Sequence, residues 1–101
     1  MVKSNTKTNH KHINLDQEGE AYINGTRIKV KHLIFYYRSG ASTESILEGF
    51  PNITPAQFFD ALSYYHDHKE EINDSLHRDD PDVIEEELGV RRKPDGTLEF
   101  T

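Results

Sequence analysis

The stretch from Ser42 to Tyr65 limits the fold more than any other part of the chain, because it holds the start and stop signals of two consecutive helices. Ser42 has the side chain of a helix N-cap, and Ile46 gives the first helix an apolar edge. Gly49 and then Pro51 predict where this helix ends, since glycine is common just past a helix C-terminus and proline cannot continue a helix.

The second helix of this stretch has the stronger start signal. Thr54 at the N-cap and Gln57 three residues later form a capping box, with Pro55 at the first helical position. Ile53 and Phe58 are placed as a hydrophobic staple. A short helix, a turn of about four or five residues and a longer helix together form the outline of a helix-turn-helix.

Composition restricts the class of protein. At 101 residues the chain suits one domain, and its 34% apolar residues are few, so we expect part of it to lack a core of its own. It has no cysteine, which excludes a disulfide framework and a thiolate zinc site. Because no apolar run has signal-peptide or membrane-spanning length, we expect a soluble, cytoplasmic protein.

The net charge of −6 is unevenly distributed. Residues 1–40 hold seven Lys/Arg and three acids, whereas residues 41–101 hold five Lys/Arg and fifteen acids. Ten of those acids, with two bases, lie in residues 67–88. This asymmetry favours a basic face for one partner and an acidic segment for another; the alternative is that the charges only solvate a small surface.

The N-terminal part of the sequence predicts an arm followed by strands. Residues 1–12 are polar and basic, and we expect a flexible arm whose His10 and His12 hold no metal. From Ile13 the pattern is strand-like, and Asn24-Gly25 predicts a type I′ hairpin turn. The strand before this turn has two candidate partners: the residues after the turn, or residues 13–16.

Helical spacing follows the strands. Val30, Leu33, Ile34 and Tyr37 predict a helix that ends at Ser39-Gly40. A last helix of residues 55–77, about 35 Å long, would outgrow so small a core, so its second half is expected to project or to pair with another chain. We therefore predict a homodimer that covers some of four otherwise unexplained side chains: Phe35, Tyr36, Ile72 and Leu76. The predicted core centres on Ile46, Phe58 and Leu62.

The C-terminal segment predicts a short acidic helix from Asp80-Pro81 to Gly89. After it comes either a terminal hairpin or a segment that orders only on binding. We expect that residues 79–101 can be deleted with little effect on folding; the alternative is an acidic helix that packs back on its own domain. The predicted fold is mainly α with an N-terminal β-hairpin and a homeodomain-like helix-turn-helix, divided into a basic arm (1–12), the hairpin and helix-turn-helix (13–77), and the acidic helix with its tail (78–101).

Three runs carry a resemblance to a known family: G-T-R-I-K-V (25–30), S-G-A-S (39–42) and S-I-L-E-G-F-P-N-I-T-P-A-Q-F-F-D-A-L-S-Y (45–64). Over about residues 13–70 the chain resembles the bacterial VapB-like antitoxins known as domain of unknown function number four hundred and thirty-three. The resemblance implies a homeodomain-like helix-turn-helix behind a β element. Because members are often encoded beside PIN-like toxins, it also implies an antitoxin that represses its own operon. Lys29 stands where the family usually has proline.

In a DNA-binding helix-turn-helix, the start of the second helix meets base edges and its flanks touch phosphates. Gln57 suits adenine, but residues 41–68 contain no Arg or Lys, and Asp60 would repel phosphate, so the cations must come from elsewhere. The candidate DNA-binding residues are Arg27, Lys29, Lys31, Arg38, Ser42, Thr43, Thr54, Gln57, Asp60, Ser63 and Tyr64.

The acidic segment is the candidate surface for a partner protein, with a negative charge that suits the basic groove of an RNA-cleaving toxin. Its candidate residues are Val83, Ile84, Glu85, Glu86, Leu88, Arg91 and Arg92. No phosphate loop or nucleophile elbow is present, and His66 and His68 are not spaced to chelate one metal, so we expect no enzyme activity, metal or cofactor.

The sequence thus favours an antitoxin-type transcriptional regulator, which binds double-stranded operator DNA and also a toxin protein. The alternative is a protein-interaction module that binds no DNA and uses the helix-turn-helix only as a scaffold.

Overall fold

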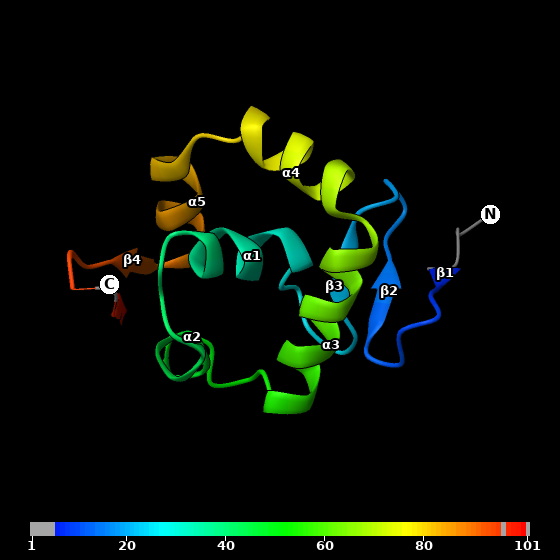
Figure 1. The fold of residues 1–101 in the computed structure, drawn as a ribbon, viewed down its shortest axis with the longest axis horizontal. Coiled ribbons are helices and arrows are strands. Elements are labelled where there is room, and N and C mark those ends of the chain that lie inside the picture. Colours follow the sequence, from blue (N-terminus) through cyan, green and yellow to red (C-terminus); the bar gives the residue numbers. More distant parts are fainter. Residues whose placement is uncertain (1–5, 96, 101) are drawn as a thin grey trace.

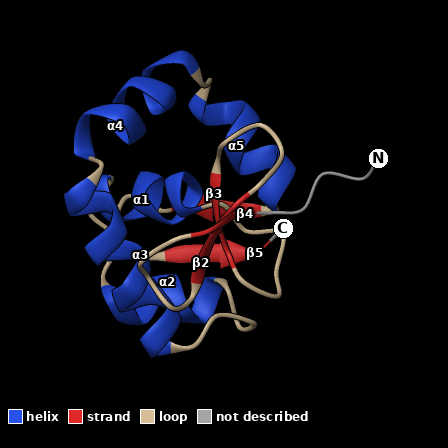
Figure 2. Cartoon of the chain, turned by 90° about the vertical axis from the view of Figure 1, so that its right-hand side faces the viewer, coloured by secondary structure: helices blue, strands red, loops and turns tan. Residues whose placement is uncertain are grey.

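The protein was analysed as a computed structural model, which describes residues 6–95 and 97–100. Within these residues there are five helices, with α2 to α5 around a central α1, and a small antiparallel sheet lies toward each end of the molecule (Figure 1). In both views α4 and α5 lie on one side of α1 and α2 lies on the other (Figures 1 and 2). The mainly helical class with an N-terminal hairpin is confirmed.

The helix-turn-helix outline is confirmed, with α1 at Val30–Arg38, α2 at Thr43–Gly49 and α3 at Pro55–Asp67. The Ser42 hydroxyl accepts the Ser45 N–H and caps α2. The capping box of α3 is complete: the Gln57 N–H donates to the Thr54 hydroxyl at 3.1 Å, and the Thr54 N–H donates to Gln57 Oε1 at 2.8 Å. These bonds satisfy backbone donors that a helix start leaves free.

The single helix predicted over residues 55–77 is wrong. His68 leaves the helical conformation (φ −130°, ψ 35°), and a separate helix α4 runs from Lys69 to Arg78. This break lets α4 fold back toward α1, which buries Ile72. Asn73 Oδ1 fastens the bend, because it accepts hydrogen bonds from Tyr65 on α3 and Arg38 on α1.

The N-terminal sheet has the order β1-β2-β3, with β1 at Thr6–Lys7, β2 at Ile13–Leu15 and β3 at Ala21–Ile23. The main partner of β3 is therefore β2, with Ile13 opposite Ile23. The flexible arm predicted for residues 1–12 is corrected for residues 6–12, since β1 pairs with β2 and the residues after β1 bind α3. Residues 1–5 lie outside the described part of the chain.

The turn at Asn24-Gly25 is present but is not type I′. A type I′ turn needs a positive φ at both central residues. Gly25 has φ +81°, but Asn24 does not have a positive φ, because every described residue with a positive φ is a glycine. The Thr26 N–H donates to the Ile23 carbonyl, the pattern of a type II turn. The chain after the turn forms only one bridge, between Lys29 and Tyr22, instead of a full strand.

The C-terminal part packs onto the domain. Helix α5 (Pro81–Leu88) starts at its Asp80 cap and ends at Gly89, as predicted, and the tail forms a hairpin of β4 (Val90–Arg92) and β5 (Leu98–Phe100). The hairpin approaches α2 closely: a Cβ at Gly49 would lie 3.2 Å from Leu98 and 3.3 Å from Val90. This packing reverses the expectation that residues 79–101 can be deleted with little effect.

The four side chains that motivated a homodimer are covered by the same chain. Tyr36 is fully buried and donates its hydroxyl to the Val90 carbonyl at 2.6 Å, while Phe35 packs on the core below the Arg92 guanidinium. Ile72 is buried and Leu76 is partly buried. These side chains therefore give no reason for a dimer, and the homodimer stays a prediction.

The core prediction holds for Ile46 and Phe58, which are fully buried, but is wrong for Leu62, which is only partly buried. The buried face of α3 runs through Phe58, Ala61 and Tyr65 instead, and Leu62 lies at its edge. None of the helices within residues 6–95 is long and apolar enough to cross a membrane.

Candidate interaction surfaces

Two of the cations proposed for DNA binding are engaged in ion pairs. Lys29 Nζ lies 2.9 Å from Glu20 Oε1, and Lys31 Nζ lies 2.9 Å from Glu20 Oε2 and 3.0 Å from Asp79 Oδ2. Lys31 also donates to the Ser75 hydroxyl. This cluster joins the loop before β3, the start of α1 and the end of α4, so its lysines are held by carboxylates of the same domain.

The titration of this cluster follows from its geometry. Burial alone would raise the pKa of Glu20, but hydrogen bonds from Lys31 and Lys29 outweigh burial and lower the pKa. Burial would likewise lower the pKa of Lys31, but its hydrogen bonds to Glu20 and Asp79 raise the pKa. Beside it, burial and the two lysines lower the pKa of His32 to about 4.

The predicted base-reading face of α3 is largely occupied by the protein itself. Thr54 and Gln57 Oε1 form the capping box, and Asp60 accepts the His12 N–H at 2.7 Å. Tyr64 is buried, 5% exposed, so its assignment as an exposed phosphate donor is wrong. Ser63 remains exposed on this helix.

The other residues proposed to contact DNA differ in their exposure and in their hydrogen bonds within the protein. Arg27 is exposed, and Arg38 is exposed while donating to Asn73. Ser42 is used as the cap of α2, and Thr43 is half-buried in its first turn. Of the four proposed cations, Arg27 and Arg38 are thus the exposed ones, whereas Lys29 and Lys31 are half-buried in ion pairs.

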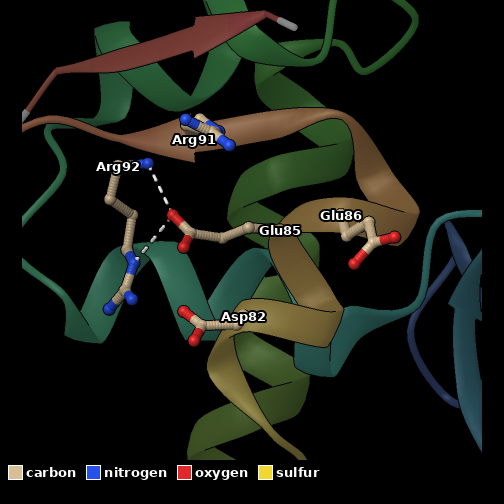
Figure 3. A pocket seen from close by; sticks show the side chains of 5 residues that line it. All are labelled: Asp82, Glu85, Glu86, Arg91 and Arg92. Carbon is tan, nitrogen blue, oxygen red and sulfur yellow. Dashed lines mark hydrogen bonds and ion pairs between the residues drawn. The ribbon is translucent and has the colours of Figure 1, made fainter.

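The proposed partner-binding residues around α5 and β4 also divide in two (Figure 3). Ile84 is buried and Leu88 is partly buried against the core, so the expectation that they offer an apolar edge to a partner is corrected. Glu85 accepts both the backbone N–H and Nε of Arg92. The Arg92 guanidinium lies 4.6 Å from the Phe35 ring centroid.

Glu86 and Arg91 are exposed, as is Val83 at 46%. Together with Asp82, Glu85 and Arg92, the side chains of Glu86 and Arg91 line a hollow of about 530 Å³ between α5 and β4 (Figure 3). The exposed side chains around this hollow are therefore mixed in charge, with the carboxylates of Asp82 and Glu86 beside the guanidinium of Arg91.

These carboxylates belong to a larger acidic surface on α4 and α5. Among the exposed side chains of residues 69–88, two are the bases Lys69 and Arg78. Seven are acids: Glu70, Glu71, Asp74, Asp80, Asp82, Glu86 and Glu87. We call these seven carboxylates the acidic surface. All seven belong to α4, to α5 or to the residue before α5, and these two helices lie on the same side of α1 (Figures 1 and 2).

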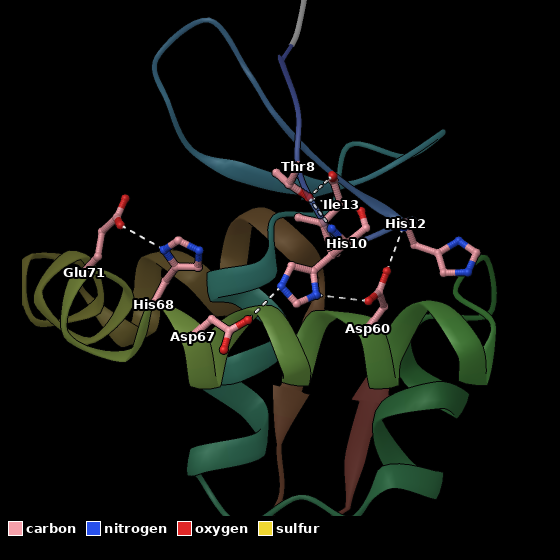
Figure 4. A network of polar contacts seen from close by, with 8 residues as sticks. All are labelled: Thr8, His10, His12, Ile13, Asp60, Asp67, His68 and Glu71. Atoms are coloured by element: carbon pink, nitrogen blue, oxygen red, sulfur yellow. Dashed lines mark hydrogen bonds and ion pairs between the residues drawn. The ribbon is translucent and has the colours of Figure 1, made fainter.

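His10, predicted to lie in a flexible arm, has a fixed place in the structure that the sequence did not indicate. The His10 ring lies between two carboxylates of α3, with Nδ1 3.3 Å from Asp60 Oδ1 and Nε2 3.0 Å from Asp67 Oδ2 (Figure 4). The ring also meets the edge of Tyr64. No local pattern signals these contacts, because they join residues about fifty positions apart.

Within the described ranges, no group of three or more His, Cys, Asp or Glu side chains is arranged to hold a metal ion. Residues 17–65 match a protein family described as "protein of unknown function (DUF433)". This match spans β3, α1, α2 and most of α3, and it ends before α4 and α5 begin. No curated protein and no solved structure matches the chain.

Proposed function

We propose that this protein is an antitoxin-type interaction module, which binds a basic partner protein through the acidic surface of α4 and α5. The observation that carries the proposal is the set of seven exposed carboxylates on these helices, with only two exposed bases among them. The resemblance to VapB-like antitoxins supports a PIN-like toxin as the partner, because such a nuclease presents a basic groove to its RNA.

The acidic surface has the features of a protein-binding site. Interfaces combine a buried apolar centre with a polar rim, and complementary charge speeds association and excludes wrong partners. Val83, 46% exposed on α5, supplies an apolar side chain among the carboxylates. The surface belongs to the folded domain, because Ile72 anchors α4 and Ile84 anchors α5.

The test is calorimetric titration with the product of the neighbouring gene. Glu86→Lys combined with Glu87→Lys reverses two exposed charges on α5, and we expect it to weaken binding at least tenfold at low salt. Both positions lie near the C-terminus of α5, where a cation favours the helix dipole, so the variant should fold.

Glu18→Lys combined with Glu48→Lys is the matched control, because it makes the same charge change at exposed positions outside α4 and α5. We expect this control to bind like the wild type apart from a small change in association rate. Equal weakening in both variants would mean that only net charge matters, and unchanged affinity in the α5 variant would refute the proposed surface.

A second candidate function is a DNA-binding regulator, favoured by the N-capped helices α2 and α3 of the helix-turn-helix and by the exposed Arg27. Lys29 and Lys31 are poor positions for a test, because reversing them would break the ion pairs with Glu20. Arg27→Glu tests the idea without that defect, with Arg91→Glu as its exposed control.

Fluorescence anisotropy with a duplex from the protein's own promoter region would measure DNA binding. A regulator should bind at low salt and lose affinity steeply as salt rises, with a shallower slope in Arg27→Glu. If the wild type fails to bind at low salt, DNA binding is excluded and the interaction module remains.

A further inference from the structure

The segment Thr8–His12 is fixed to α3 mainly by polar contacts (Figure 4). His10 reaches Asp60 with one ring nitrogen and Asp67 with the other, while the His12 N–H donates to the second oxygen of Asp60. Within the segment, the His10 N–H donates to the Thr8 hydroxyl at 3.1 Å. The segment is also held to the sheet, because the Thr8 hydroxyl donates to the Ile13 carbonyl of β2 at 2.6 Å and the Asn24 N–H donates to the His12 carbonyl. Its hydrogen bonds to α3 are those of His10 and His12 to Asp60 and Asp67.

The number of hydrogen bonds that His10 can donate depends on its proton. A protonated imidazole has two N–H donors, so it can donate to Asp60 and Asp67 at once. A neutral imidazole has one donor, and its other nitrogen then points a lone pair at a carboxylate. Protonated His10 therefore holds the segment to α3 with two charge-assisted hydrogen bonds. Neutral His10, in the same position, holds it with a single weaker hydrogen bond.

Among the side chains that the structure describes, several charged or titratable groups lie near His10. Asp60 and Asp67 face its ring from α3, and Tyr64, also on α3, presents its ring edge. His68, at the α3–α4 break, stacks on Tyr64 and pairs with Glu71 at 3.6 Å. On the segment itself, Lys11 is exposed, and the His12 ring points away from Asp60 (Figure 4).

We propose that Thr8–His12 is a proton-dependent cover on α3: the segment closes over Asp60 and Tyr64 when His10 is protonated and loosens when His10 is neutral. Imidazole is the side chain whose charge generally changes between about pH 5 and 8. Opening exposes the face of α3 that a helix-turn-helix offers to its ligand. The inference stands independently of the proposed partner surface.

The test is hydrogen exchange of the His12 amide, measured at about pH 5.5 and about pH 8 and corrected for the intrinsic pH dependence of exchange. This amide reports directly on the cover, because it donates to Asp60. Since Asp67 is largely exposed, we expect a modest effect, a loss of protection of about two- to fivefold at the higher pH. The Ile23 amide, bonded to the Ile28 carbonyl, serves as the internal reference and should show no such change.

Two variants assign the effect to the His10 pair. His10→Gln keeps a polar side chain without the titration, and Asp67→Asn removes one carboxylate at an exposed site; both should reduce or abolish the pH dependence. His68→Gln is the matched control and should retain it, because His68 pairs with Glu71 and not with the two carboxylates. Equal protection of His12 at both pH values in the wild type, or a pH dependence that persists in His10→Gln, would overturn the proposal.

Discussion

His32 on α1 is a partly buried titratable group, and its buried Nδ1 has no hydrogen-bond partner among the described residues. Burial and the nearby lysines lower the pKa of His32 from 6.5 to about 4. Between these two pH values His32 is therefore protonated in the unfolded chain and neutral in the folded chain. The stability contributed by neutral His32 is therefore complete above about pH 6.5 and is lost as the pH falls toward 4.

Between pH 7 and pH 5 this loss should amount to about 2 kcal/mol. Urea unfolding at the two pH values checks it, with His32→Gln as the comparison. The variant should lose less stability on acidification than the wild type does. An equal loss in both proteins would show that His32 titrates normally. Exchange of the His12 amide is a local measurement and urea unfolding is a global one, so the two experiments separate His10 from His32.

Tyr36 connects α1 to the C-terminal hairpin through a single buried hydrogen bond. Its hydroxyl donates to the Val90 carbonyl at 2.6 Å, and burial raises its pKa to about 12. Tyr36→Phe leaves that carbonyl without its donor, which should cost roughly 1–3 kcal/mol of unfolding free energy. Tyr37→Phe, at the exposed neighbouring position, should change stability little in the same denaturation experiment. Equal effects from the two variants would contradict a structural role for the Tyr36 bond.

At the scale of elements, α5 and the β4–β5 hairpin complete the core instead of forming a separable arm. Ile84 and Val90 are buried, and Leu98 lies against Gly49 of α2. Deleting residues 79–101 would expose Tyr36 and Phe50, so we expect a much lower melting temperature or no cooperative transition by circular dichroism. A truncated protein that melts like the full chain would show that the hairpin contributes little to stability.

The elements that could be predicted from the sequence are those with local causes. Caps such as Ser42, Thr54 and Asp80 act on backbone groups two or three residues away, so their pattern alone places the starts of α2, α3 and α5. The break at His68 has no such signal, because the apolar spacing continues through it to Ile72. The contacts of Asn73 with α1 and α3 hold that bend, and these contacts are tertiary.

The candidate sites were less predictable than the elements for the same reason. Composition identified the acidic segment, and most of its carboxylates are indeed exposed. Sequence alone did not show that Lys31 is paired with Glu20 and Asp79, or that Tyr64 is buried beside His10. Such partners lie far apart in the chain, so the sequence does not show that a polar side chain already forms ion pairs or packing contacts within its own domain.

At the scale of the whole molecule, three large apolar side chains stay exposed among the described residues: Tyr37, Phe59 and Val83. They lie on three different helices, α1, α3 and α5, so we do not infer a dimer surface from them. Light scattering at micromolar concentration tests the predicted homodimer. A mass near the 11.7 kDa of one chain would contradict the dimer, and a mass near twice that value would support it.

The central claim, that α4 and α5 form the partner surface, is tested most directly by NMR mapping. The isotope-labelled chain would be titrated with the unlabelled product of the neighbouring gene, and amide shifts and line broadening would be followed along the chain. We expect the largest changes at the exposed positions of α4 and α5, around Val83 and Glu86, with smaller changes on α2. Changes confined to α2 and α3, with α4 and α5 unaffected, would contradict the account.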